Sequence, residues 1–218
     1  LDDAYRFAMQ LFSGQFRGSG KPFLCHLVGT ASVLAALSAP TPIVAAGLLH
    51  AAYTLGNFGS GWLGINAVKR RAVREKVGDT VEDLVKRYAE LEWHDETPAE
   101  VLDRLSRGEP IDRDAILIRL ANEVDEHLDL GILYCKEAAQ RVRRAARIQQ
   151  PCVALAERLG YAALAAAVQD SFRLCTSGSV PSNLRQNSDL SFTLPVLSRA
   201  RWRLRRLRYL LRRTTPGE

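Results

Sequence analysis

Apolar residues recur at steps of three and four along much of this chain, which is the spacing of one face of an α-helix. Val81, Leu84, Val85 and Tyr88 follow this spacing, and no segment alternates apolar and polar residues over a useful length. The pattern therefore predicts an all-α fold. Helices are expected at residues 3–12, 23–37, 43–55, 67–77, 80–91, 98–107, 112–130, 137–149, 151–159 and 161–174.

Proline, glycine and polar residues separate these helices. Residues 13–22 form a glycine-rich turn, and the polar residues 92–110 are expected to be a surface excursion. Residues 176–194 are rich in Ser, Asn and Pro, which is typical of a linker. We therefore predict a helical domain at residues 1–175, a linker at 176–194 and an arginine-rich C-terminal helix and tail at 195–218.

The C-terminal segment carries the basic character of the chain. Eight arginines lie between Arg199 and Arg213, whereas the chain before Pro195 has 22 basic and 23 acidic residues. Leucines at steps of three or four make this segment a basic amphipathic helix, which could fold back on the domain or contact a protein or an anionic membrane. The nearly neutral remainder has no basic face for specific binding of a nucleic-acid duplex.

Length and composition exclude several classes of protein. The 218 residues suit one domain with an appendage, and no apolar run approaches the ~18 residues that span a bilayer. The first ten residues lack the pattern of a signal peptide. The four cysteines have no CxxC spacing, so free thiols in a cytoplasmic protein are expected.

Two histidines mark the ends of an apolar helical pair. His26 stands near the start of the first helix and His50 near the end of the second, with Pro40 and Pro42 between them. An antiparallel hairpin that turns at the prolines would bring both imidazoles to the same end. They are either core residues or part of a site.

Six segments in order resemble the hydrolase domain of Rel/SpoT-type (p)ppGpp enzymes, a member of the HD phosphohydrolase superfamily. The similarity runs from about residue 17 to residue 172, with the last segment one residue short, and it implies a single HD-type helical domain. The segments are residues 17–26 (RGSGKPFLCH), 44–50 (VAAGLLH), 77–85 (VGDTVEDLV), 118–122 (IRLAN), 155–160 (LAERLG) and 169–172 (QDSF).

The sequence departs from this family at the metal ligands. The resemblance places ligands at His26 and His50, but Ala51 replaces the HD aspartate and Asn122 the later aspartate. Thr54 and Leu55 stand where the family has a Glu-Asp pair. Hard cations prefer anionic oxygen ligands, so no cofactor is expected and a standard HD metal phosphohydrolase is disfavoured.

Polar and acidic residues on one predicted helix could take the place of the missing aspartate ligands. Asn122, Asp125, Glu126 and Asp129 fall at i, i+3, i+4 and i+7, on one face. With His26 and His50, they could hold a divalent metal (Mn, Fe or Zn), or they could act as a general base. If a metal binds, its ligands would be His26, His50, Asn122 and Asp125. The alternative is an exposed acidic face, or carboxylates that pair with arginines.

The glycine-rich turn contributes candidate ligand-binding residues. Arg17, Ser19 and Lys21 lie there, and the resemblance implies that Arg17 contacts a nucleotide base. Guanidinium groups also bind phosphate in bidentate fashion. Tyr53 follows the second histidine, so its hydroxyl could serve the pocket or make a structural hydrogen bond.

Three functions are consistent with these features. The first is an enzyme that acts on a phosphorylated or nucleotide-like small molecule, through hydrolase-like or metal-independent acid/base chemistry. The second is a pseudoenzyme that binds such a ligand without chemistry. The third is a non-catalytic interaction protein that docks through the C-terminal helix. Residues assigned to catalysis in the first are His26, His50, Tyr53, Asn122, Asp125 and Glu126, with Arg17, Ser19 and Lys21 binding the ligand.

Overall fold

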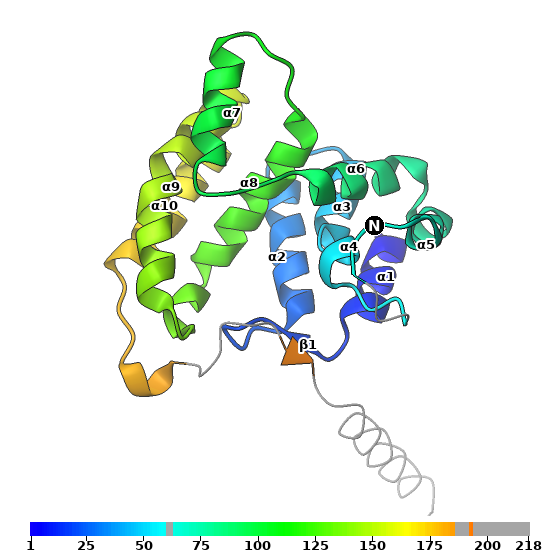
Figure 1. The fold of residues 1–218 in the computed structure, drawn as a ribbon, viewed down its shortest axis with the longest axis horizontal. Helices are drawn as coiled ribbons and strands as arrows, with labels where there is room; N and C mark the ends of the chain where they lie inside the picture. The colour runs from blue at the N-terminus through cyan, green and yellow to red at the C-terminus, as the bar shows by residue number, and fades with distance from the viewer. Residues whose placement is uncertain (60–62, 186–191, 194–218) are drawn as a thin grey trace, which may run out of the picture.

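The computed structural model describes residues 1–59, 63–185 and 192–193, and it confirms the all-α class (Figure 1). The elements in chain order are α1 (Asp2–Phe12), β1 (Gln15–Phe16), α2 (Phe23–Ala36), α3 (Thr41–Leu49), α4 (Ala52–Leu55), α5 (Ala67–Val77), α6 (Asp79–Glu90), α7 (Thr97–Ser106), α8 (Arg113–Leu128), the 3₁₀ turn η1 (Gly131–Tyr134), α9 (Ala138–Arg158), α10 (Ala162–Ser177), the 3₁₀ turn η2 (Ser182–Leu184) and β2 (Phe192–Thr193).

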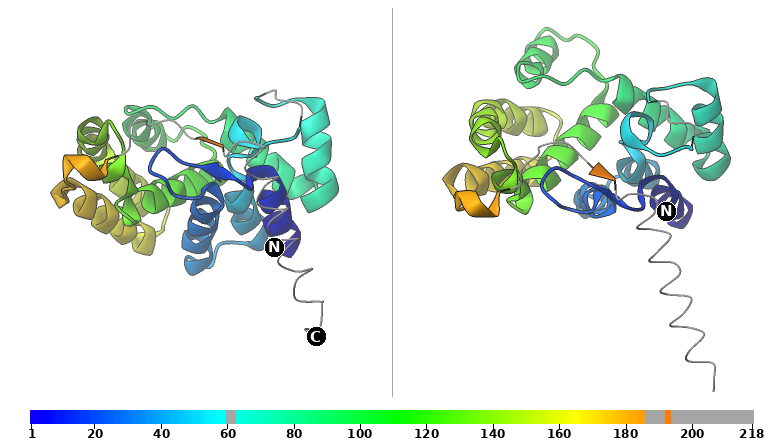
Figure 2. Two further views of the ribbon diagram at one scale, coloured as in Figure 1. Left: turned by 90° about the horizontal axis from the view of Figure 1, so that it is seen from below. Right: turned by 60° about the horizontal axis from the view of Figure 1, so that its bottom comes forward.

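Helix α8 is the centre of the fold. It packs against α2 and α6 on one side and against α10 on the other, and it lies between these two groups in both views of Figure 2. Asp112 caps its N-terminus by accepting a hydrogen bond from the Ala115 amide (3.0 Å). Because α8 is covered on opposite faces, its polar residues Asn122, Glu123 and Asp125 are buried with its apolar ones.

The α2–α3 pair forms the predicted hairpin and packs closely. Pro22 and Pro40 precede the two helices as N-caps. A Cβ added at Gly47 would lie 2.6 Å from Leu34 Cδ1, so glycine permits the close approach of the helices. His26 and His50 consequently lie at the same end of the hairpin.

Two expectations about helices need correction. The helix expected at residues 43–55 is interrupted at His50 and Ala51, which separate α3 from α4. The helices expected at 137–149 and 151–159 are one helix, α9, with Pro151 inside it. Proline removes one backbone hydrogen bond, but the long buried contact of α9 with α10 maintains the helix.

The polar excursion at residues 92–110 is also more than a surface loop, because its helix α7 packs on α9 and buries Pro98 and Val101. Part of the predicted linker is ordered as well: β2 pairs antiparallel with β1, with Gln15 opposite Thr193. The predicted C-terminal helix and tail at residues 195–218 lie outside the described residues. Among the residues described, no helix is long and apolar enough to cross a membrane.

Candidate functional site

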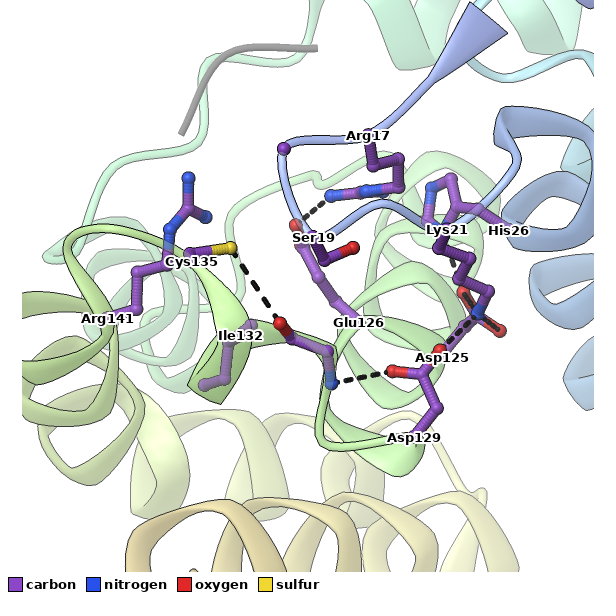
Figure 3. A pocket seen from close by; sticks show the side chains of 12 residues that line it. Arg17, Ser19, Lys21, His26, Asp125, Glu126, Asp129, Ile132, Cys135 and Arg141 are labelled. Atoms are coloured by element: carbon purple, nitrogen blue, oxygen red, sulfur yellow. Dashed lines mark hydrogen bonds and ion pairs between the residues drawn. The ribbon is translucent and has the colours of Figure 1, made fainter. Parts of the chain in front are cut away.

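Two hollows meet where the α2–α3 hairpin reaches α8. The smaller, of about 110 Å³, lies between the glycine-rich turn, α8 and η1 (Figure 3). The larger, of about 340 Å³, lies between α4, α6 and α8. His26 lines the smaller hollow and His50 the larger, whereas Arg17 and Glu126 line both.

The two histidines converge at this place. Their ring centroids lie 5.1 Å apart with the rings nearly perpendicular, and the residues are only 2% and 4% exposed. Burial lowers the pKa of His26, and burial together with His26 lowers the pKa of His50 well below its ordinary value. Both imidazoles are therefore neutral near pH 7.

Each imidazole has one nitrogen tied to an acceptor. His50 Nδ1 lies 2.8 Å from the Gly47 carbonyl oxygen, and His26 Nδ1 lies 2.6 Å from Asp125 Oδ2. A backbone carbonyl oxygen only accepts, and Asp125 is the counter-ion of Lys21, so we assign the proton to Nδ1 in both rings. The Nε2 atom of each histidine is then the basic nitrogen.

Two features hold Asp125 beside His26: the charge of Lys21 and the absence of a side chain at Gly29. Lys21 Nζ lies 3.0 Å and 3.1 Å from the two Asp125 oxygens and 2.9 Å from Asp129 Oδ2. Burial lowers the pKa of Lys21, but Asp129 and Asp125 outweigh it and raise the pKa overall. A Cβ at Gly29 would lie 1.7 Å from Asp125 Oδ1, so the pair forms only because position 29 has no side chain.

The glycine-rich turn presents Arg17 and Lys21 from a tight backbone turn. The Arg17 amide donates to the Lys21 carbonyl (2.9 Å), and the Gly20 amide donates to the Arg17 carbonyl (2.8 Å). Gly20 has a φ of +83°, which glycine adopts without strain. Arg17 Nη2 donates to Glu126 Oε1, and Figure 3 shows this ion pair at the centre of the site.

Aromatic and cationic side chains build the larger hollow. Trp93 Nε1 donates to Glu123 Oε1 (3.1 Å), and Arg119 Nη2 donates to the same oxygen (2.6 Å). Arg119 Nη1 also donates to the Tyr88 hydroxyl (3.2 Å). Burial would raise the pKa of Glu123, but Arg119 and Arg144 lower it overall. The wall of this hollow is thus fixed by one buried carboxylate.

Comparisons with known proteins bear on the fold that carries this site. A family model described as a domain of unknown function, DUF6817, matches residues 9–92. A solved structure, described as a metazoan ortholog of SpoT that hydrolyzes ppGpp and plays a role in starvation responses, superposes with a TM-score of 0.53 at 18% identity. The match covers 79% of this chain and 93% of that one. The chain has the HD-type fold.

Two curated proteins also resemble the HD-type domain. Both are described as probable GTP diphosphokinase RSH3, chloroplastic, from Arabidopsis thaliana, and they are 28% identical to the chain over 200 and 202 residues. Each alignment covers 86% of this chain but 25% of the relative. The chain therefore spans about a quarter of the length of these relatives.

The donors in this HD-type domain do not fit a divalent metal. Across residues 1–59, 63–185 and 192–193, no group of three or more His, Cys, Asp or Glu side chains is arranged to hold an ion. Asp125 is paired with Lys21 and Glu126 with Arg17, so cationic side chains of the chain already neutralise these carboxylates. The possible ligand set of His26, His50, Asn122 and Asp125 stays a prediction, and in this structure its one carboxylate, Asp125, is bonded to Lys21.

Tyr53 lines neither hollow and makes a structural hydrogen bond, which is one of the two alternatives that the sequence left open. Its hydroxyl donates to Glu82 Oε1 (2.8 Å), and Glu82 also receives bonds from Arg70 and Arg74. Burial would raise the pKa of Glu82, but the hydrogen bonds from Arg70, Tyr53 and Arg74 lower it to about 2. Because the helix breaks at His50, Tyr53 points into the contact between α4 and α6.

We expect Tyr53→Phe to lower the free energy of unfolding by about 1–2 kcal/mol, because the buried Glu82 carboxylate loses one donor. Chemical denaturation measures this change. Tyr5→Phe, at an exposed tyrosine, is the control and should change stability little. Equal stability of the two variants would contradict the assignment of the Tyr53 hydroxyl to Glu82.

Several residues of the site were not predicted from the sequence. Gly29, Tyr88, Trp93 and Arg119 were not singled out as site residues. The i, i+4 spacing of Arg119 and Glu123 was visible as a helical ion pair. Nothing in the sequence placed Trp93, from the polar segment before α7, against that pair.

Proposed function

We propose that the chain binds a phosphorylated or nucleotide-like small molecule at the two hollows and acts on it by metal-independent acid/base chemistry. The observation that carries this proposal is the convergence of two neutral imidazoles, His26 and His50, beside the Arg17 guanidinium. Neutral imidazole accepts protons near pH 7, and a guanidinium binds a phosphate or carboxylate.

The contacts of each residue indicate its role in proton transfer or in ligand binding. Asp125 orients His26 and keeps its proton on Nδ1, so that Nε2 can accept a proton from water or a ligand hydroxyl. Arg17, with Ser19 and Lys21 in the same hollow, would hold the anionic group. Asn122 and Glu126 line the larger hollow beside His50, where they can bond the remainder of the ligand.

The relatives support a nucleotide-like ligand. The curated relatives are described as GTP diphosphokinases, and the solved structure as a protein that hydrolyzes ppGpp. Ala51, Thr54 and Leu55 favour a second candidate, which is binding without hydrolysis, because no carboxylate stands at these positions. Phosphate release from nucleotides by wild type and His26→Ala separates the two candidates.

We expect Arg17→Ala to weaken binding of guanosine monophosphate (GMP) by about 10- to 100-fold, since a charge-assisted hydrogen bond contributes ~1.5–3 kcal/mol. Glu126→Gln should have the opposite effect and tighten binding, because the amide no longer competes with the ligand for Arg17. Isothermal titration calorimetry measures both dissociation constants.

Two variants serve as controls for these measurements. Tyr53→Phe lies outside both hollows, and Glu75→Gln changes an exposed carboxylate that pairs with Arg71 on α5. Neither should change the affinity for GMP. Unchanged affinity in Arg17→Ala would show that the ligand is not held at this site.

A further inference from the structure

The larger hollow has aromatic side chains and an arginine, Arg119, to which the proposed function assigns no role. Its lining includes three aromatic side chains, Phe23, Tyr88 and Trp93, and two guanidinium groups, from Arg17 and Arg119. Its volume of about 340 Å³ lies within the range of ~300–1,000 Å³ that is typical of small-molecule sites. We infer that this hollow binds a planar aromatic ring that carries one anionic group.

The aromatic wall is rigid before any ligand arrives. The Arg119 guanidinium carbon lies 5.5 Å from the Trp93 ring centroid, and both side chains bond the buried Glu123 carboxylate. The Tyr88 ring lies 5.1 Å from the His50 ring. Because these contacts hold the side chains in place, a ring that enters loses little affinity to their ordering.

Part of the lining is apolar. Ala51, Leu55, Ala89 and Leu91 contribute to it, and Leu55 is 40% exposed. A divalent metal with its hydration shell would gain nothing from these groups, whereas a ring would bury apolar surface against them. Ala51 and Leu55 thus give this hollow a surface that suits a ring better than a hydrated cation.

Arg17 is the group at this hollow that can receive an anion. The guanidinium groups of Arg17 and Arg119 are paired with Glu126 and with the buried Glu123, so an anion would bind by replacing the Glu126 carboxylate at Arg17. Arg17 borders both hollows, so an anion attached to a ring in the larger hollow can reach it. A nucleoside monophosphate has this chemistry, and so does an aromatic carboxylate.

The test uses two substitutions that add bulk or charge to the larger hollow and leave the hydrogen bonds of its lining in place. Ala89→Leu fills the hollow, and its control is Ala99→Leu at an exposed position of α7. Leu55→Asp places a negative charge at the exposed edge, and its control is Val68→Asp at an exposed position of α5. The probes are GMP, guanosine, inorganic phosphate and indole-3-acetate, titrated into the full chain by calorimetry.

We expect Ala89→Leu and Leu55→Asp each to weaken GMP binding at least about tenfold. Ala89→Leu would exclude the ring from the hollow, and the carboxylate of Leu55→Asp would repel the phosphate. The two controls should bind like wild type, and guanosine and phosphate should bind more weakly than GMP. Leu55→Asp tests the inference even if Ala89→Leu fails to fold, because Leu55 is exposed.

This inference rests on the proposed function, because it takes from it the binding of an anionic group by Arg17. The four probes distinguish failure of the inference from failure of the proposed function. If GMP binding requires Arg17 but tolerates both hollow variants, the inference is wrong and the proposed function stands. If only indole-3-acetate binds, and the hollow variants weaken it, the inference stands and a phosphorylated ligand is wrong. If neither GMP nor indole-3-acetate binds, both are wrong.

Discussion

Replacing Glu123 by alanine is expected to lower the free energy of unfolding by about 3–5 kcal/mol, because it leaves charged partners of a buried ion pair without their counter-charge. Glu123 is fully buried and accepts hydrogen bonds from Arg119, Arg144 and the Trp93 indole. Without Glu123, the Trp93 and Arg119 side chains at the larger hollow lose their shared hydrogen-bond acceptor. We therefore expect ligand affinity to fall together with the free energy of unfolding.

Urea denaturation of wild type and Glu123→Ala measures the change. Glu75→Ala is the matched control, because Glu75 is also a helical glutamate paired with an arginine but is 67% exposed. Exposed pairs of this kind contribute at most about 1 kcal/mol. Similar losses in the two variants would contradict a central structural role for Glu123.

Substituting Gly29 by alanine is expected to destabilise the protein by about 1–3 kcal/mol, although alanine is the better helix former. The new Cβ would lie 1.7 Å from Asp125 Oδ1 and 2.6 Å from Asp125 Cγ, so the aspartate side chain must move. The movement would separate Asp125 from His26 and Lys21. Chemical denaturation measures the loss of stability.

A double-mutant cycle with Asp125→Ala isolates this steric cause. In the Asp125→Ala background the space beside position 29 is open, so Gly29→Ala should be neutral or should stabilise α2 by up to about 1 kcal/mol. The same loss in both backgrounds would show that Asp125 is not the group that meets the new methyl.

The two expected results concern two acidic residues within one turn of α8, Glu123 and Asp125. Their contacts show why this helix buries carboxylates. Asp125 orients His26 at the smaller hollow, and Glu123 orients Trp93 and Arg119 at the larger one. Glu126 lies between the hollows and bonds Arg17. Buried carboxylates persist here because each is paired with cationic or hydrogen-bonding partners.

The sequence by itself determined the helical class and the hairpin. Apolar spacing is a local signal, and prolines at 22, 40 and 42 mark helix starts, so α1, α2, α5, α6 and α8 were predicted to within two residues. The convergence of His26 and His50 followed from the same hairpin geometry. The departures at Ala51 and Asn122 likewise were visible from the sequence alone.

Only the tertiary structure decided what surrounds the histidines. Asp125 meets His26 across 99 residues of sequence, and the side chain of Trp93 meets Glu123 across 30. Such contacts depend on how α8 is rotated against its neighbours and on the space left by Gly29, which spacing along one helix does not specify. For the same reason Tyr53 was predicted near His50, while the break after α3 turned it toward Glu82.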